Sequence, residues 1–270
     1  MNLIKKLIIL PLVSLLFAGC LQVETNVHVN KDGSGTIHEK VLMSKTFVDM
    51  LKGFAQSFDD SASTEEFTLF TEEEIKGNAI NYGENINYVS HEFVSNDNWE
   101  GYIAEFSFKD ITNVKLTPDP DTKVDAVMSE GSSEEGDYYF FKFQKEETSE
   151  LIIDRPEINF EESNEDEFEQ QEAEQENEEG GDEFLSMMEG MSINISVEVD
   201  GNIINTNANY VESSKITLLQ MDFSEMMKNK EEFKKFKNRE PKNIEEMKEF
   251  LEKFPGMKVE IQKPVTIKFQ

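Results

Sequence analysis

Apolar and polar residues alternate one by one along several stretches of this 270-residue chain. Such alternation is typical of β-strands that bury one face of a sheet. It is clear from Ile193 to Val199 and from Val23 to Val29, and the latter stretch runs into a glycine-rich turn, Asn30 to Gly35, followed by a second strand from Thr36 to Met43. Because a tight turn joins two such strands, the pattern predicts an antiparallel hairpin with one face on the core.

Further strands and a few helices are expected along the rest of the chain. The predicted strands cover 86–94, 99–108, 137–145, 203–208 and 215–221, with a final strand or strand pair within 257–269. Helices are expected after Ser44, after the capping box Thr71–Glu74, over 224–237, and after Asn243, which has Glu246 three residues later. Strands that come in runs rather than alternating with helices favour an α+β fold, with a mostly antiparallel sheet and a few packed helices.

An acidic segment interrupts this pattern. Residues 161–183 include thirteen acidic residues and no Lys or Arg. Such a stretch buries too little apolar surface to offset the entropy of ordering it, so we expect a disordered acidic insert over 156–183. The insert would divide one α+β domain into an N-terminal part, 20–155, and a C-terminal part, 184–270. The sequence leaves open whether these two parts share a sheet.

The first twenty residues have the layout of a secretory signal. Met1 to Lys6 carries two positive charges, 7–17 is an apolar run, and Ala18 and Gly19 are small. The apolar run is shorter than the roughly 20 residues that a membrane-spanning helix needs. Cys20, which follows, is the only cysteine of the chain, so no internal disulfide can form.

The residues Phe17-Ala18-Gly19-Cys20 resemble the lipobox of bacterial lipoproteins, although the family usually has Leu where this chain has Phe17. The resemblance implies that 1–19 is a lipoprotein signal peptide, that cleavage occurs before Cys20, and that this cysteine carries acyl chains such as palmitate. The protein would then be anchored by lipid to a membrane of the cell envelope, with its domain facing the periplasm or the cell exterior. The alternative is an ordinary signal peptide cleaved nearby, which leaves Cys20 as a free thiol.

Three longer segments resemble the LppM-type bacterial lipoprotein domain, a family of uncharacterised envelope lipoproteins. They are VHVNKDGSGTIHEKVLMSK, GYIAEFSFKDITNVKL and ISVEVDGNIINTNANYVESSKITLLQMDF, within about residues 20–223. The family usually has Pro-Gly in place of Asp200-Gly201, and the acidic insert and the helices after Ser224 look like additions. The resemblance implies an α+β, lipid-anchored envelope domain that binds a lipid or a glycolipid. It implies no catalytic residues. An envelope protein is a further candidate partner, expected from the anchor and the strand-rich domain.

The charge excludes some partners. The formal net charge is −30, and removal of 1–19 takes away Lys5 and Lys6, which leaves −32. Such a domain repels nucleic acid and anionic lipid headgroups alike. We therefore expect no nucleic-acid partner and a membrane contact made through the lipid anchor.

Signatures of catalysis are missing from the sequence. It contains no nucleophile elbow, phosphate loop or dinucleotide fingerprint, and its three histidines stand apart. We therefore expect no enzyme activity, no cofactor and no metal site. Two alternatives stay open: an envelope hydrolase that uses a pair of carboxylates, and a calcium-binding surface protein whose acidic insert collects cations.

Two predicted strands are rich in aromatic residues, most of which lie on one face of their strand. Such rows usually form core, but they could also line an apolar ligand cavity. The candidate lining residues are Trp99, Tyr102, Phe106, Phe108, Tyr139, Phe141 and Phe143.

Overall fold

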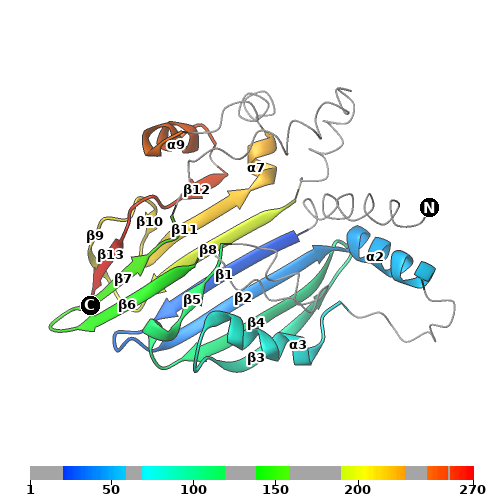
Figure 1. Ribbon diagram of the computed structural model, residues 1–270, viewed down its shortest axis with the longest axis horizontal. Helices are drawn as coiled ribbons and strands as arrows, with labels where there is room; N and C mark the ends of the chain where they lie inside the picture. Colours follow the sequence, from blue (N-terminus) through cyan, green and yellow to red (C-terminus); the bar gives the residue numbers. More distant parts are fainter. Residues whose placement is uncertain (1–20, 59–68, 119–137, 158–189, 229–241, 255) are drawn as a thin grey trace, which may run out of the picture. The chain divides into compact units, whose positions relative to one another are not determined.

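The structure is a computed structural model that describes residues 21–58, 69–118, 138–157, 190–228, 242–254 and 256–270 (Figure 1). The chain divides into two compact units. The smaller consists of 1–21, 158–192 and 222–257, and the larger of 22–157, 193–221 and 258–270. The described part of the smaller unit contains the helices α7, Phe223–Met227, and α9, Ile244–Leu251.

Among the described residues, the larger of the two sheets has eight strands. Seven of its strands follow the order β10-β11-β8-β1-β2-β4-β3. The eighth, β12, also pairs with β11. The pairs β10–β11, β2–β4 and β3–β4 are antiparallel, and Glu39 of β2 lies opposite Ala104 of β4. The bounds of these strands are β1 Leu21–Val29, β2 Gly35–Ser44, β3 Asn87–Ser95, β4 Trp99–Phe108, β8 Ser192–Val199, β10 Val211–Glu212, β11 Lys215–Asp222 and β12 Met257–Val259.

The second sheet has five strands in the order β5-β6-β7-β13-β9. In its centre Leu151 lies opposite both Phe143 and Ile267, and Ile153 lies opposite Phe141. These side chains share one face, which is apolar. The bounds are β5 Lys115–Leu116, β6 Tyr139–Lys145, β7 Ser149–Asp154, β9 Ile203–Thr206 and β13 Val265–Phe269.

Each sheet combines strands from both sides of the acidic segment. In the first sheet β8 lies next to β1, and Asn26 Nδ2 donates a hydrogen bond of 2.8 Å to Ser196 Oγ. In the second sheet β13 and β9 follow β7. The segments before and after 158–189 therefore complete the same two sheets, which answers the question that the sequence left open.

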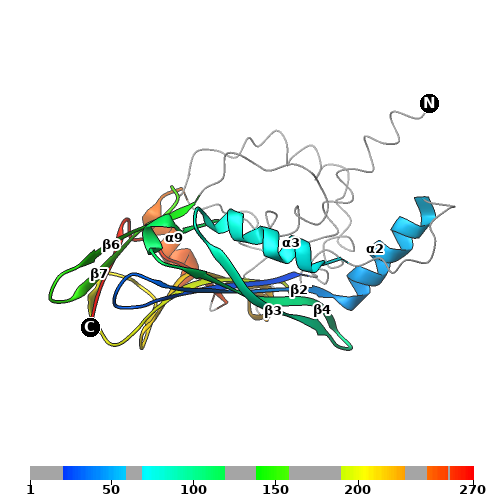
Figure 2. The same ribbon diagram turned by 90° about the horizontal axis from the view of Figure 1, so that it is seen from below.

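Helices cover part of the apolar face of the first sheet. The helix α3, Glu72–Gly77, begins at a capping box: Glu74 N donates to Thr71 Oγ1, and Thr71 N donates to the Glu74 carboxylate. It continues into the 3-10 helix η1, Asn78–Tyr82. Figure 2 shows α3 and the β6–β7 hairpin on the same side of the sheet formed by β1–β4. The remaining helices in the described part of the larger unit are α2, Lys45–Phe58, and η2, Ile111–Asn113.

The described chain is predominantly β-sheet with some helices, which confirms the coarser part of the expected fold class. The predicted caps at Thr71 and Asn243 are confirmed. Three strands of the described chain were not predicted: β5 and β10, which have only two residues each, and β7, with the sequence Ser-Glu-Leu-Ile-Ile-Asp. The expected acidic insert and most of the helix predicted over 224–237 lie outside the described residues. Within the described residues, no helix has both the length and the apolar character to cross a bilayer.

A glycine in the connection after η1 offers a test of the packing. Gly83 has φ of +122°, and a Cβ at this position would lie 2.0 Å from the backbone oxygen of Asn113. We expect Gly83→Ala to lower the free energy of unfolding by about 2 kcal/mol or more, because backbone strain adds to the clash. Gly77 is the matched control, since it has helical φ of −61° and its Cβ would meet open space. Denaturant titration should show little loss or a gain for Gly77→Ala, and an equal loss in both variants would contradict this account.

Candidate functional site

The residues predicted to carry the anchor lie just before the described chain. Phe17, Ala18, Gly19 and Cys20 are outside the described residues. The strand β1 begins at Leu21, the residue directly after Cys20, and Leu21 is buried, with 6% of its surface exposed. A modified Cys20 would therefore be adjacent in sequence to an ordered, buried strand.

The predicted aromatic residues do not form one continuous lining. Tyr102 contacts Phe70, with ring centroids 5.1 Å apart, and Phe106 contacts Tyr82 at 5.3 Å; both belong to the first sheet and its covering helix. Phe143 instead contacts Phe269 of the second sheet, at 6.5 Å. Trp99 and Phe143 are half-buried, and the other five candidates are buried: Tyr102, Phe106, Phe108, Tyr139 and Phe141. Their packing is that of core, and their use by a ligand stays a prediction.

A buried carboxylate lies among these rings. Glu39 is at an inward position of β2, between Ile37 and Val41, and none of its surface is exposed. The Tyr102 hydroxyl donates a hydrogen bond of 2.8 Å to Glu39 Oε1, and the Tyr82 hydroxyl donates to Oε2. Because a buried charge is costly unless it is paired or hydrogen-bonded, these two hydroxyls are needed to hold the carboxylate in the core.

The same network attaches the helical segment to the sheet. Asn78 Nδ2, at the start of η1, donates a hydrogen bond of 3.0 Å to the Tyr102 hydroxyl. Tyr82, at the end of η1, reaches Glu39 and also hydrogen-bonds through its hydroxyl with Thr25 of β1. Residues of β1, β2, β4 and η1 thus meet in one hydrogen-bonded group, which we call the Glu39 cluster.

The buried tyrosines are expected to lower the free energy of unfolding at alkaline pH. Burial, with the nearby Glu39 carboxylate, raises the pKa of Tyr82 and Tyr102 well above the usual 10.0, and burial raises the pKa of Tyr139 to about 12. An acid whose pKa is raised on folding contributes stability that is complete below its unfolded pKa and is lost as pH rises through its folded pKa.

We therefore expect the free energy of unfolding to fall steeply above about pH 10. Ultraviolet absorbance of tyrosinate, recorded together with circular dichroism, should show Tyr82, Tyr102 and Tyr139 ionising only as the fold is lost. Ionisation of all six tyrosines of the chain near about pH 10, with the fold intact, would contradict the burial of these hydroxyls.

A second buried carboxylate follows β12. Glu260 has none of its surface exposed. Its Oε2 accepts a hydrogen bond of 2.6 Å from Asn209 N, and its Oε1 accepts bonds from Asn209 Nδ2 at 2.6 Å and from Gln262 N at 2.9 Å. Three N–H donors therefore satisfy this carboxylate, and it fixes the chain before β13 against the connection between β9 and β10.

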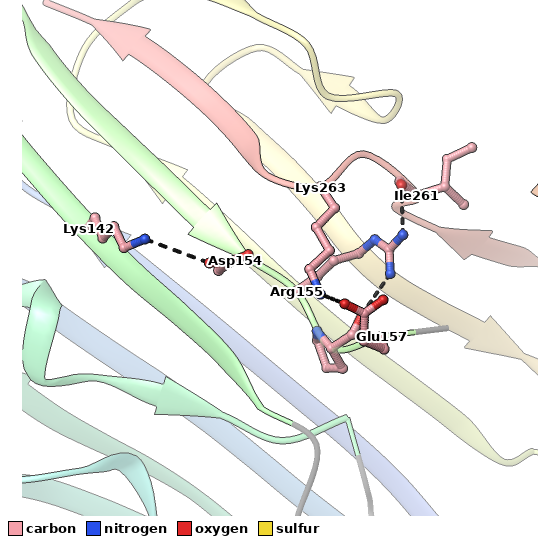
Figure 3. A network of polar contacts seen from close by, with 7 residues as sticks. Lys142, Asp154, Arg155, Glu157, Ile261 and Lys263 are labelled. Atoms are coloured by element: carbon pink, nitrogen blue, oxygen red, sulfur yellow. Dashed lines mark hydrogen bonds and ion pairs between the residues drawn. The ribbon is translucent and has the colours of Figure 1, made fainter. Parts of the chain in front are cut away.

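A buried arginine lies nearby, at the end of β7 (Figure 3). Arg155 Nη2 donates a hydrogen bond of 2.9 Å to the backbone oxygen of Ile261, and Nη1 donates one of 2.6 Å to that of Pro156. Its Nε is buried and has no hydrogen-bond partner among the described residues. The exposed pairs around it are Lys263–Glu157 at 2.5 Å and Lys142–Asp154 at 3.7 Å. Arg155 thus links the strand β7 to the chain before β13.

The two buried carboxylates have separate surroundings. Glu39 accepts hydrogen bonds from hydroxyls of β4 and η1, whereas Glu260 accepts them from N–H groups of Asn209 and Gln262. Glycoside hydrolysis requires two carboxyl groups that flank one substrate bond. Glu39 and Glu260 instead each accept hydrogen bonds from the protein through both oxygens. Among the described residues, no group of three His, Cys, Asp or Glu side chains could hold a metal ion.

Sequence reasoning missed both carboxylates and Arg155. For Glu39 a signal was present, because an acid at an inward position of an alternating strand must find a polar partner in the core. Glu260, between Val259 and Ile261, gave a weaker signal of the same kind. Nothing in the sequence pointed to their partners, because Tyr82 and Asn209 are distant in the chain.

Comparison with known proteins gives little further guidance. No protein-family model matches the chain, and no curated protein does. Among solved structures the chain is similar to the NMR structure of the folded domain of Mycobacterium tuberculosis LppM, over 94% of this chain and 91% of that one. The sequence identity is 7% and the TM-score is 0.31. A TM-score this low does not establish a shared fold, so membership of that family stays a prediction.

Proposed function

We propose that this protein is a lipoprotein of the bacterial cell envelope, held at a membrane by acyl chains on Cys20, and that its folded part acts by binding rather than by catalysis. The observation that supports the anchor best is the sequence around Cys20, in which an apolar run is followed by two small residues. The only cysteine of the chain directly precedes an ordered strand, and a small-residue cleavage site directly precedes that cysteine.

The proposed anchor has a consequence for the position of the domain. A strand rises about 3.3 Å per residue, so an acylated Cys20 keeps the first residues of β1 within a few ångströms of the lipid headgroups. A mature chain with a net charge of −32 is repelled by an anionic surface over about 8 Å at physiological salt. The anchor therefore has to hold the domain against this repulsion.

Binding is favoured over hydrolysis by the state of the buried acids. Both oxygens of Glu39 and both oxygens of Glu260 accept hydrogen bonds within the protein, and neither side chain is exposed. A general acid or base has to reach the reacting group of a substrate. The two acids therefore serve the structure in this proposal, and the ligand is a lipid, a glycolipid or an envelope protein.

Metabolic labelling tests the anchor. Bacteria that produce the protein are grown with a fatty acid that carries an alkyne tag, and the purified protein is examined for the tag. We expect the tag on the peptide that contains Cys20, and none in a Cys20→Ala variant. Because the chain has one cysteine, no other thiol can give the signal. An untagged wild-type protein would refute the proposed anchor.

Lipid extraction tests which class of ligand is bound. Residues 21–270 are purified from the envelope fraction without the anchor, and extracted lipids are identified by mass spectrometry. A lipid recovered in about equal amount to the protein identifies a lipid ligand. A protein that brings no lipid directs the search to polypeptide partners.

A further inference from the structure

The edges of the two sheets differ greatly in length. The second sheet ends in β5 and β9, which have two and four residues, and one end of the first sheet has the two-residue strand β10 with β12 beside it. The other end of the first sheet is β3, with nine residues. Proteins usually keep edge strands short because an open edge can pair with another chain. The strand β3 departs from this rule.

The side chains of β3 do little to block such pairing. Its sequence, Asn-Tyr-Val-Ser-His-Glu-Phe-Val-Ser, contains no Lys and no Pro. Val89 and Phe93 are exposed, Phe93 to 52%. A register shift between Tyr88 and Ser90 disturbs the first part of the strand, but from Ser90 to Ser95 the pairing with β4 is regular. This regular part is what we call the open edge of β3.

The register shows which backbone groups face outward. Asn96 N donates a hydrogen bond of 2.9 Å to Trp99 O, at the turn between β3 and β4. In an antiparallel pair, successive residues direct their N–H and C=O groups alternately toward the partner strand and away from it. Ser90, Glu92 and Val94 therefore bond to β4, whereas His91, Phe93 and Ser95 direct their backbone groups away, where the described chain places no further strand.

The charge around this edge favours a basic partner. Exposed acids lie on α3, on the connection from η1 to β3, on β3 itself and on the turn to β4. Two nearby lysines are paired with acids, Lys76 with Glu72 at 2.6 Å and Lys52 with Glu100 at 3.4 Å. The acids are Glu72, Glu73, Glu84, Glu92 and Asp97. A second copy of the chain would bring the same acids and a net charge of −30, and would be repelled.

We propose that the open edge of β3 binds an extended, lysine- or arginine-rich segment of a partner protein by β-strand addition. The backbone groups of His91, Phe93 and Ser95 pair with the added strand. Apolar side chains of the segment lie on Phe93, whose ring packs edge-on against His91 at 4.8 Å between centroids. Its basic side chains lie near Glu92, on the opposite face. This inference rests on the sheet edge and does not require the acyl anchor.

A synthetic peptide tests the proposal. The probe has about ten residues in which lysine and valine alternate, a length that matches β3. Two control peptides replace every lysine with glutamate, or methylate alternate backbone nitrogens. Calorimetry with residues 21–270 should show binding of the first peptide, and binding at least tenfold weaker for both controls. Equal binding of the acidic peptide, or no binding of any peptide, would overturn the proposal.

Matched variants locate the binding. Phe93→Pro removes an outward N–H group without touching the groups that bond to β4, and Phe93→Lys places a like charge beside the peptide. Phe140→Lys is the control, since Phe140 is exposed to 53% on the second sheet. We expect at least a tenfold loss for both Phe93 variants and none for Phe140→Lys, with melting temperatures unchanged. A loss of equal size at Phe140 would refute the site.

Amide hydrogen exchange shows which backbone groups of β3 take part in binding, and sedimentation shows whether a second copy of the chain binds there. His91, Phe93 and Ser95 should exchange rapidly in the free protein and slowly with the lysine peptide. Slow exchange of these amides in the free, monomeric protein would mean that the edge is already covered, and would overturn the proposal. Sedimentation that shows a dimer, lost on Phe93→Pro, would identify a second copy as the occupant and refute a basic partner.

Discussion

Loss of the proposed acyl anchor on Cys20 is expected to move nearly all of the protein from the membrane fraction to the soluble envelope fraction. Each buried CH₂ of an acyl chain contributes about 0.8 kcal/mol, so one chain binds marginally and two or three bind durably. Within the described residues no helix is long and apolar enough to span a membrane. Removal of 1–19 would leave a net charge of −32, which gives the chain no attraction to anionic lipid.

The variant has to separate acylation from cleavage. Substitution of Cys20 alone can leave the apolar leader 7–17 attached, and this leader would itself hold the chain at the membrane. We therefore specify a variant in which residues 1–19 are replaced by a signal peptide whose cleavage does not require the cysteine. This variant also carries Cys20→Ala. The wild-type protein should resist washing with high salt and alkali. Retention of this variant at the membrane after the same washes would contradict the proposed anchor.

Replacement of Glu39 by alanine is expected to destabilise the larger unit by about 3–5 kcal/mol. The change leaves a cavity and removes the acceptor of two buried hydroxyls, those of Tyr82 and Tyr102. Since whole domains are stable by only about 5–15 kcal/mol, such a loss is a large share of the total. Urea denaturation, followed by circular dichroism, measures it as a lower midpoint.

Three further variants make this prediction specific. Glu39→Gln keeps the shape and one acceptor oxygen, and should cost less than Glu39→Ala. Tyr102→Phe removes one donor and should cost about 1–3 kcal/mol, with a smaller additional effect of Glu39→Ala in its presence. Glu92→Ala, on the exposed face of β3, is the control and should change stability by less than about 0.5 kcal/mol. A Glu39→Ala effect no larger than that of Glu92→Ala would refute the Glu39 cluster as a structural element.

The sequence predicted local features of the fold better than its long-range pairing. Alternation in β1 and β8 identified both strands and their buried faces, since a period of two residues fixes the face of each side chain. It could not identify β1 and β8 as neighbours, because alternation carries no information about the partner strand. The capping box at Thr71 was readable because its hydrogen bonds join residues three apart.

The candidate site was less predictable for the same reason. Glu39 could have been singled out as an acid at an inward position, but its donors Tyr82 and Tyr102 are brought to it by the pairing of β2 with β4 and by the packing of η1. The open edge of β3 depends on the strand order of the whole sheet, which no local pattern contains. Features made by distant segments therefore required the structure.

The intact mass of the protein from its natural membrane distinguishes an acylated Cys20 from a free one. We expect the mass of residues 20–270 plus two or three acyl chains with their linking group on Cys20. A mass equal to the full 270-residue chain, or to a mature chain with an unmodified cysteine, would contradict the anchor and, with it, the assignment of this protein to the envelope.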